Sequence, residues 1–146
     1  MTIQLTRHKD SSIRTAHATF GVIRLEDINI YTMEKPWVFD KKKYPFGKPN
    51  NSCIPAGTYD IIQTSSNQFY LESAAQGIAY KSPSETKRFK CGIGLSERTS
   101  YGEVNIVPGL SIARVDNLLK VTQIARAFDL LAQYLKEDKK LSIIWS

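Results

Sequence analysis

The sequence predicts a single, mostly β domain of the α+β class, with many strands and one main helix near the C-terminus. Three observations carry this prediction. Short segments rich in β-branched and aromatic residues recur along most of the chain, separated by turn residues. One amphipathic pattern with helical spacing follows them, and an apolar segment closes the chain. A chain of 146 residues fits one domain, 1–146, that buries a core of its own.

The first part of the chain reads as three strands. The segment 3–8 (IQLTRH) alternates loosely between apolar and polar residues, which is typical of a strand. The segments 15–25 and 28–34 are rich in β-branched and aromatic residues, and the short link between them predicts a hairpin.

A long connection, 35–52 (KPWVFDKKKYPFGKPNNS), follows this hairpin. Its prolines and glycine argue against regular structure, and loops of this length are often functional. Lysines alternate with aromatic residues, a combination suited to stacking and to phosphate contacts. The alternative is a loop pinned by its aromatic side chains, with its lysines in water. The candidate binding residues are Trp37, Lys41, Lys42, Lys43, Tyr44, Phe46 and Lys48.

The stretch 50–62 (NNSCIPAGTYDII) predicts a sharp turn that leads into a strand at 58–64. Pro55 fixes its own φ and lacks a backbone N–H, while Gly57 adopts conformations that other residues resist. Because this turn is a scaffold element, we expect Cys53 to be a small buried packing residue rather than a reactive thiol.

The rest of the chain adds further strands and the helix. The letters FYLES and GIAYKS predict a hairpin around 74–77, and the segments 90–96 and 102–107 predict two more strands, the second ended by Pro108 and Gly109. Apolar residues at helical spacing predict a helix over about 122–136, with Thr122 as its N-cap. The segment 140–146 predicts a last strand, whose edge is a candidate for pairing with a neighbouring protein.

Charge and cysteine usage limit the classes of partner and cofactor. The net charge of +6 favours anionic partners such as nucleic acid, cell-wall polymers or acidic protein surfaces, although a basic domain without such a partner has the same charge. The chain has two cysteines and no Cys-x-x-Cys pair, so we do not expect a structural zinc site. No metal and no cofactor are predicted. Two reduced, buried thiols are expected, with a single disulfide as the alternative.

The N-terminal letters MTIQLTRHKD contain no apolar signal region, and no apolar run approaches the ~20 residues of a membrane span. We therefore expect synthesis in the cytoplasm without a signal peptide, and no membrane span.

Two motifs resemble an uncharacterised domain family that is common in bacteriophages. The letters TMEKPW (32–37) match its Thr-x-Glu-x-Pro-Trp segment, and SCIPAGTY (52–59) matches its Ser-Cys-Ile-Pro-x-Gly-x-Tyr motif completely. The later half of the family pattern looks like the catalytic motif of L,D-transpeptidases, which cross-link peptidoglycan. The resemblance spans nearly the whole chain and implies an L,D-transpeptidase-like fold.

The sequence departs from this pattern at both catalytic positions. An L,D-transpeptidase uses a Cys thiolate that a neighbouring His activates. Ser96 stands where the resemblance implies the His, and Glu103 stands where it implies the Cys. A second alignment makes Cys91 the nucleophile, but it places Tyr80 or Lys81 at the His position. The two histidines of the chain, His8 and His17, both lie in the first strands.

A different chemistry remains as a hypothesis for this region. Glu103 beside Arg98 and Tyr101, with Ser96 nearby, would act as a general acid or base in peptidoglycan cleavage. Glycan cleavage usually needs a second carboxylate at a defined separation, and the sequence does not fix one. The alternative is a former catalytic pocket that now serves binding or packing.

The resemblance thus implies a bacteriophage protein of the virion, in the tail or injection machinery, with a degenerate L,D-transpeptidase-like domain. Its expected partners are other virion proteins and peptidoglycan. One alternative is a peptidoglycan-degrading enzyme of phage lysis or host penetration that uses Glu103. Another is a single-stranded nucleic-acid-binding module, for which the 35–52 loop and the segment 87–90 (KRFK) supply cations and aromatic rings.

Overall fold

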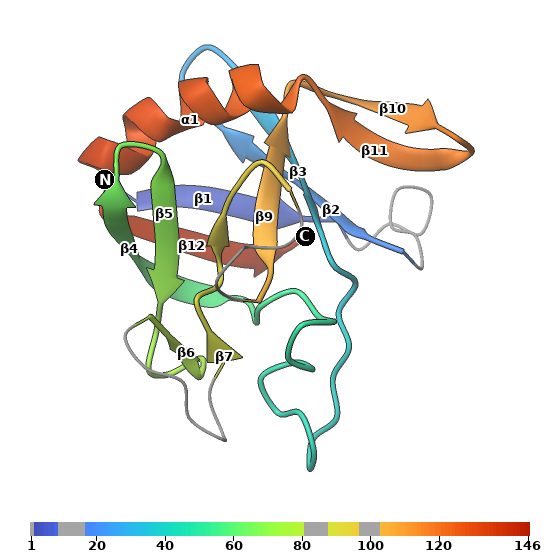
Figure 1. Ribbon diagram of the computed structural model, residues 1–146, viewed down its shortest axis with the longest axis vertical. Helices are drawn as coiled ribbons and strands as arrows, with labels where there is room; N and C mark the ends of the chain where they lie inside the picture. The colour runs from blue at the N-terminus through green and yellow to red at the C-terminus, as the bar shows by residue number, and fades with distance from the viewer. Residues whose placement is uncertain (1, 9–16, 81–87, 97–102) are drawn as a thin grey trace.

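A computed structural model describes residues 2–8, 17–80, 88–96 and 103–146 of the chain. Eight strands of this described part close into a barrel in the order β1-β12-β4-β5-β8-β9-β3-β2 (Figure 1). They are β1 (Thr2–Arg7), β2 (Thr19–Arg24), β3 (Asn29–Glu34), β4 (Gly57–Ser65), β5 (Gln68–Glu72), β8 (Gly92–Ile93), β9 (Asn105–Gly109) and β12 (Lys140–Trp145). The strand-rich α+β class is therefore confirmed, and so are the strands expected near 3–8, 28–34, 58–64 and 140–146.

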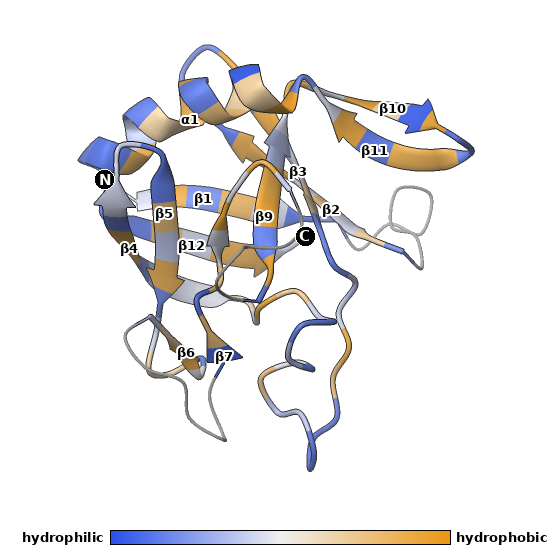
Figure 2. Cartoon of the chain, in the orientation of Figure 1, coloured by the Kyte–Doolittle hydropathy of each residue, from blue (hydrophilic) through white to orange (hydrophobic). Residues whose placement is uncertain are grey.

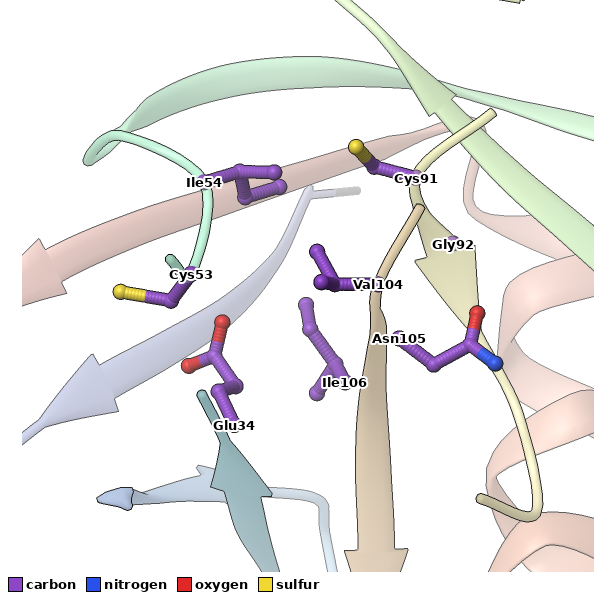
Figure 3. A pocket seen from close by; sticks show the side chains of 8 residues that line it. All are labelled: Glu34, Cys53, Ile54, Cys91, Gly92, Val104, Asn105 and Ile106. Carbon is purple, nitrogen blue, oxygen red and sulfur yellow. The ribbon is translucent and has the colours of Figure 1, made fainter. Parts of the chain in front are cut away.

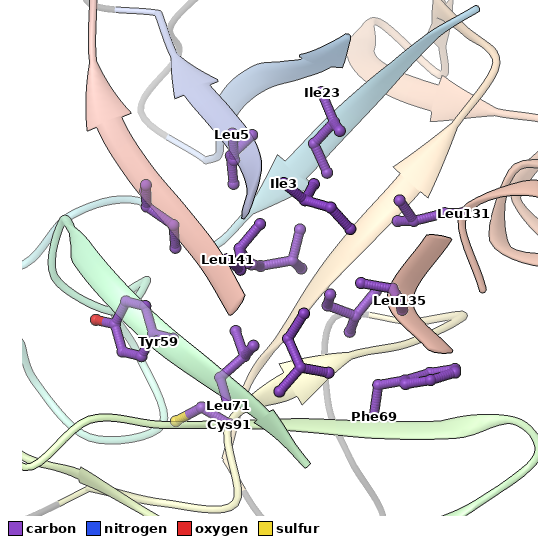
Figure 4. Close-up of a cluster of buried hydrophobic side chains, with 14 of the residues drawn as sticks. Ile3, Leu5, Ile23, Tyr59, Phe69, Leu71, Cys91, Leu131, Leu135 and Leu141 are labelled. Carbon is purple, nitrogen blue, oxygen red and sulfur yellow. The ribbon is translucent and has the colours of Figure 1, made fainter. Parts of the chain in front are cut away.

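The barrel closes because alternate side chains of its strands point into one apolar interior. Ile3 and Leu5 of β1 are buried, while Gln4 between them is exposed. Leu71 from β5 and Leu141 from β12 fill the same core, as Figure 4 shows. Figure 2 shows hydrophobic and hydrophilic residues following one another along these strands and the helix. Burial of this apolar surface supplies the main stabilisation of the fold.

The helix α1 (Ile124–Glu137) covers one end of the barrel (Figure 1). It buries Ala127, Phe128, Leu131, Ala132 and Leu135, and the ring of Phe128 lies 6.1 Å from the ring of Phe69. The predicted helix is confirmed, but the predicted N-cap is wrong. Thr122 ends β11 (Leu118–Thr122), where its hydroxyl contacts that of Ser111, and Gln123 precedes the helix in a left-handed conformation.

The last strand lies between two other strands of the barrel. β12 pairs in parallel with β1 on one side and antiparallel with β4 on the other. The pairing with β4 covers Lys140 to Ile143 and the pairing with β1 covers Lys140 to Trp145. The expectation that the last strand offers an edge to a neighbouring protein is therefore wrong up to Ile143, where both sides are already paired inside the barrel.

The strand β9 runs two residues further than expected, through Pro108 to Gly109. It pairs with β3 through both of these residues, but it pairs with β8 only through Asn105 and Ile106. Pro108 lies beyond the last pair with β8, where the strand needs no N–H donor on that side. The proline therefore does not end the strand.

Two further pieces lie outside the barrel. The predicted reversal around 74–77 is confirmed by a bridge between Ser73 and Ile78, but the residues that follow leave the barrel. There β6 (Ile78–Ala79) pairs in parallel with β7 (Arg88–Phe89). The second piece is a hairpin of β10 (Ser111–Val115) and β11, which the sequence analysis did not predict. Its signal is the pair Asp116-Asn117, both at positive φ, between two apolar segments.

None of the helices in the described residues has the length and apolar character needed to cross a membrane.

Candidate functional site

Arg88, the first residue of β7, anchors the 35–52 loop to the barrel. Its side chain is only 2% exposed, and its Nε donates a 2.9 Å hydrogen bond to Oε1 of Glu103. Nη1 donates to the carbonyl oxygens of Phe46 (3.3 Å) and Cys53 (2.8 Å), and Nη2 donates to the carbonyl oxygen of Ser52. One planar guanidinium therefore binds a carboxylate and three backbone carbonyls of the loop and its exit.

Glu103 completes this arrangement from the residues just before β9. Besides the bond from Arg88, its Oε1 accepts a hydrogen bond from the backbone N–H of Asn50 (2.9 Å). Its Oε2 accepts one from the backbone N–H of Phe89 (3.0 Å). Both carboxylate oxygens are thus engaged, and the buried charge has the partners that burial requires. We interpret Glu103 as a structural anion that joins the loop to β7.

Two glycines allow the loop to approach the body of the protein this closely. Gly47 has φ 85°, and a Cβ there would lie 2.9 Å from both Nη1 of Arg88 and Oγ of Ser52. Gly77 has φ 68°, and a Cβ there would lie 2.5 Å from the ring of Phe46. A side chain at either position would collide with the anchor, so glycine is required at both.

The outer part of the loop presents a stacked aromatic pair. The rings of Trp37 and Phe39 are 5.6 Å apart and nearly parallel, with an angle of 13° between their planes. Phe39 is 52% exposed and its neighbour Val38 is 37% exposed. Sequence reasoning did not select Phe39, although its spacing of two residues from Trp37 was a usable signal, because alternate residues of an extended segment share a face.

The lysines of the loop are held in a defined turn. The Asp40 carboxylate accepts hydrogen bonds from the backbone N–H groups of Lys42 (2.8 Å) and Lys43 (2.9 Å). These bonds to the charged form lower the pKa of Asp40 below its usual value. Lys41, Lys42 and Lys43 are exposed, so their ammonium groups point to water from an ordered backbone.

The remaining predicted binding residues divide into two kinds. The Nζ of Lys48 lies 5.7 Å from the centre of the Tyr44 ring, a cation–π distance, on the outer part of the loop. Phe46 instead packs against Gly77, and its carbonyl oxygen accepts a bond from Arg88. The structure thus brings the predicted residues into one loop, with Phe46 as an anchor rather than an exposed ring.

A second group of cations and rings lies beside this loop. The Nζ of Lys90 lies 5.7 Å from the centre of the Tyr80 ring and 5.4 Å from that of Phe89. Arg88 connects this group to the loop, since its backbone N–H donates to the carbonyl of Gly77 (2.7 Å) while its side chain binds Phe46. Figure 1 shows β6, β7 and the loop at the same end of the barrel. Lys87, the first residue of the predicted 87–90 segment, lies outside the described residues.

Another buried ion pair lies just inside this end of the barrel. Arg7 ends β1 and Glu34 ends β3, and their side chains are 0% and 2% exposed. Nε and Nη2 of Arg7 donate to the two carboxylate oxygens of Glu34 at 2.9 and 2.6 Å. The guanidinium carbon also lies 5.2 Å from the centre of the Trp145 ring. This bidentate pair links β1 to β3, the two strands that flank β2.

The hollow beside Glu34 is not a ligand site. Figure 3 shows its lining, which includes Cys53, Ile54, Cys91 and Val104, with Ile54 opposite Cys91 and Val104. The space between these side chains is too small to admit even a water molecule. It is therefore a packing feature of the core.

Both cysteines are free and buried, as expected from the sequence. Burial raises the pKa of the Cys53 thiol to about 11 and that of the Cys91 thiol to about 12, because a thiolate loses its hydration there. A thiol nucleophile needs the opposite shift. His17 lies elsewhere, with its Nε2 3.1 Å from the carbonyl oxygen of Leu119.

Of the other predicted catalytic candidates, only Ser96 lies within the described residues. Ser96 is exposed, and its backbone carbonyl accepts a 2.9 Å hydrogen bond from Nδ2 of Asn105. Arg98 and Tyr101 lie outside the described residues, so their expected position beside Glu103 stays a prediction. In the described part of the chain, no cluster of three or more His, Cys, Asp and Glu side chains is arranged to hold a metal ion.

Comparison of this chain with protein-family models, with curated proteins and with solved structures finds no match. The site is therefore interpreted from its own geometry.

Proposed function

We propose that this chain is a virion-associated binding module of a bacteriophage, in the tail or injection machinery. In this proposal the chain is a degenerate L,D-transpeptidase-like domain that works without that chemistry. The complete SCIPAGTY motif and the Thr-x-Glu-x-Pro-Trp segment support the phage origin. The closed, strand-rich barrel with one late helix is compatible with such a fold.

The observation that carries the non-enzymatic proposal is the engagement of Glu103. This carboxylate stands where the resemblance implies a nucleophile, and its oxygens accept three hydrogen bonds from Arg88, Asn50 and Phe89. An acid or base must exchange a proton with its substrate, which here requires breaking a buried ion pair. The same pair instead holds the 35–52 loop in place, and we therefore assign it to binding.

The chemistry of the loop suits a polymer with ring faces and negative charges. The Trp37–Phe39 pair offers a flat aromatic surface, and Lys41, Lys42 and Lys43 offer exposed cations next to it. Peptidoglycan carries sugar rings and peptide carboxylates in close succession, so it matches both features. The net charge of +6 adds a long-range attraction to such a polyanion.

Co-sedimentation with intact peptidoglycan sacculi tests this proposal. We expect the wild-type chain to pellet with sacculi, and the triple variant Lys41→Ser, Lys42→Ser, Lys43→Ser to bind at least about tenfold more weakly. The matched control Lys120→Ser, Lys136→Ser, Lys139→Ser removes the same charge from exposed positions outside the loop. Equal binding by the two triple variants would contradict the assignment to the loop.

A second candidate function is binding of single-stranded nucleic acid. It is favoured by the position of Lys90, Tyr80 and Phe89 beside the loop, since cations interleaved with aromatic rings suit stacked bases and phosphates. Fluorescence anisotropy with a labelled oligonucleotide separates the two candidates. Tight, salt-sensitive binding to the oligonucleotide without binding to sacculi would select nucleic acid. The virion assignment has a test of its own, which is mass spectrometry of purified phage particles. Absence of this chain from the particles would contradict the assignment.

A further inference from the structure

The hairpin of β10 and β11 projects from the barrel and forms a two-stranded sheet of its own (Figure 1). Its turn consists of Asp116 and Asn117, both at positive φ, and Val115 pairs with Leu118 across it. In such a two-residue hairpin the residues that flank the turn exchange both hydrogen bonds, and the pattern then alternates. The N–H and C=O groups of Ile112 and Arg114 therefore point outward from β10, and those of Leu119 and Val121 point outward from β11.

The two edges of this sheet differ. On the β11 edge, the carbonyl oxygen of Leu119 lies 3.1 Å from Nε2 of His17, which confirms the outward direction of that group. The Cβ of Val121 packs against Gly109 of β9. On the β10 edge, the backbone groups of Ile112 and Arg114 have no backbone partner among the described residues. An edge strand with unpaired groups is a template for another strand.

Apolar side chains accompany the open edge. Val115 and Leu118 face each other across the hairpin and are 41% and 42% exposed. Ala113 lies on the same face as Val115 and is also exposed. Figure 2 shows hydrophobic colour along both strands, outside the barrel. If the β10 edges of two copies paired, the exposed Ala113 and Val115 side chains of the second copy would lie beside those of the first.

We propose that two copies of this chain associate through antiparallel pairing of their β10 strands, about an axis that passes between the two Ala113 residues. This register places Ile112 of one copy opposite Arg114 of the other. Both outward N–H groups and both outward carbonyls of each edge then find a partner. A twofold arrangement uses the same surface on each copy, and the two hairpins join into one sheet.

Charge and local geometry select this register over its neighbours. An axis at Arg114 would place the two arginines directly opposite each other, which is unfavourable. An axis at Ile112 would bring Leu110 into the pairing, but the N–H of Leu110 already donates to the carbonyl of Thr122 inside the hairpin (2.8 Å). The register about Ala113 avoids both conflicts. This self-complementarity is the reason to commit to a second copy rather than to an unrelated strand.

The salt dependence of this association differs from that of polyanion binding. Each copy carries a net charge of +6, so two copies repel each other and added salt strengthens their pairing. Binding of the 35–52 loop to a polyanion weakens as salt rises. The proposal is therefore independent of the proposed function and distinguishable from it.

Sedimentation equilibrium of the full chain over a concentration series, at low and high salt, tests the proposal. We expect a monomer–dimer equilibrium that is tighter at high salt. Arg114→Pro deletes one outward N–H but none of the hairpin's own backbone hydrogen bonds, and we expect it to weaken the dimer about tenfold or more. It also deletes the 3.2 Å hydrogen bond from Nη1 of Arg114 to the carbonyl oxygen of Asn117, which Arg114→Ala deletes as well. Arg114→Ala keeps the N–H and lowers the charge, so its dimer should be as tight as that of the wild type or tighter.

Amide hydrogen exchange of the wild-type chain provides the second measurement and does not depend on any variant. The amides of Ile112 and Arg114 should exchange more slowly as protein concentration rises, while those of Leu119 and Val121 should not change. A chain that stays monomeric at all concentrations would overturn the proposal. A dimer that protects other amides, or one that Arg114→Pro leaves unchanged while still folded, would also overturn it.

Discussion

The two buried arginines of this protein make different kinds of connection. Arg7 directs two bonds to one carboxylate, Glu34, and joins two strands of the barrel. Its Nη1 has no hydrogen-bond partner among the described residues. Arg88 binds one carboxylate, Glu103, and spreads its other bonds over the carbonyls of residues in or next to the 35–52 loop.

This difference indicates which part of the molecule each pair supports. The Arg7 pair lies within the closed barrel, so its loss should affect the global fold. The Arg88 pair attaches a segment without regular strands or helices to that barrel, so its loss should release the segment first. A polar anchor of this kind gives a surface loop a fixed shape without adding to the apolar core. Preorganisation of a binding surface lowers the ordering cost of association.

The largest effect should come from breaking the pair inside the barrel. Glu34→Gln preserves the shape of the side chain but leaves the Arg7 charge buried without its counter-charge, so we expect a loss of about 3–5 kcal/mol in the free energy of unfolding. Urea denaturation followed by circular dichroism measures this loss. The double variant Arg7→Met, Glu34→Leu removes both charges and should lose less. If Glu34→Gln lowered the free energy of unfolding by less than about 1 kcal/mol, the assignment of the Arg7–Glu34 pair to the global fold would be wrong.

Breaking the loop anchor should have a smaller and more local effect. Arg88→Lys keeps the charge beside Glu103 but cannot reach three carbonyls as well, so we expect a loss of about 1–3 kcal/mol. Amide exchange should accelerate mainly between residues 46 and 53 and much less in β1 and β12. Uniform acceleration over the whole chain would show that Arg88 supports the barrel rather than the loop.

The smallest effect concerns pH and the buried thiols. The pKa of Cys53 is about 11 in the folded chain, above the ordinary value of about 8.5–9 for an exposed thiol. Between these values the unfolded chain releases the thiol proton and the folded chain keeps it, so stability falls as pH rises from about 9 to about 11. The contribution of Cys53 to this fall should be about 1 kcal/mol between pH 8 and pH 10.

Denaturation of the wild type and of Cys53→Ala at several pH values measures that slope. The alanine variant should start less stable because of its lost volume, but its stability should fall less steeply above pH 9. Parallel pH profiles for the two proteins would contradict the raised pKa. The thiol of the native wild type should also react slowly with a thiol reagent at pH 8, and rapidly once urea unfolds the chain.

Much of the barrel is predicted by the alternation of apolar and polar residues along the sequence. The segment 3–8 predicts β1 because Ile3 and Leu5 share one face, and the spacing in 122–136 predicts the helix. The missed elements depend on local chemistry that competes with these patterns. Pro108 continues β9 because no hydrogen bond to β8 is needed there. The hairpin of β10 and β11 is encoded mainly by the two turn residues 116–117.

The site was less accessible to sequence reasoning. The loop and its lysines are visible in the composition of 35–52, but the anchor pairs residues that are distant in sequence. Arg7 does follow Ile3 and Leu5 on the inward face of its strand, and this position was a usable signal of burial. No pattern in the sequence relates Arg88 to the carbonyls of Ser52 and Cys53, because the closed barrel and the β6–β7 pair bring them together.

The most direct test of the central claim, that Glu103 anchors a binding loop and does no chemistry, is a muropeptide analysis. Purified wild-type protein and the Glu103→Gln variant are each incubated with intact peptidoglycan sacculi, and the soluble and cross-linked products are separated. We expect no new products from either protein, and we expect weaker retention of the 35–52 loop on the barrel in the variant. Products formed by the wild type and lost in a folded Glu103→Gln variant would contradict the account and make Glu103 a catalytic residue.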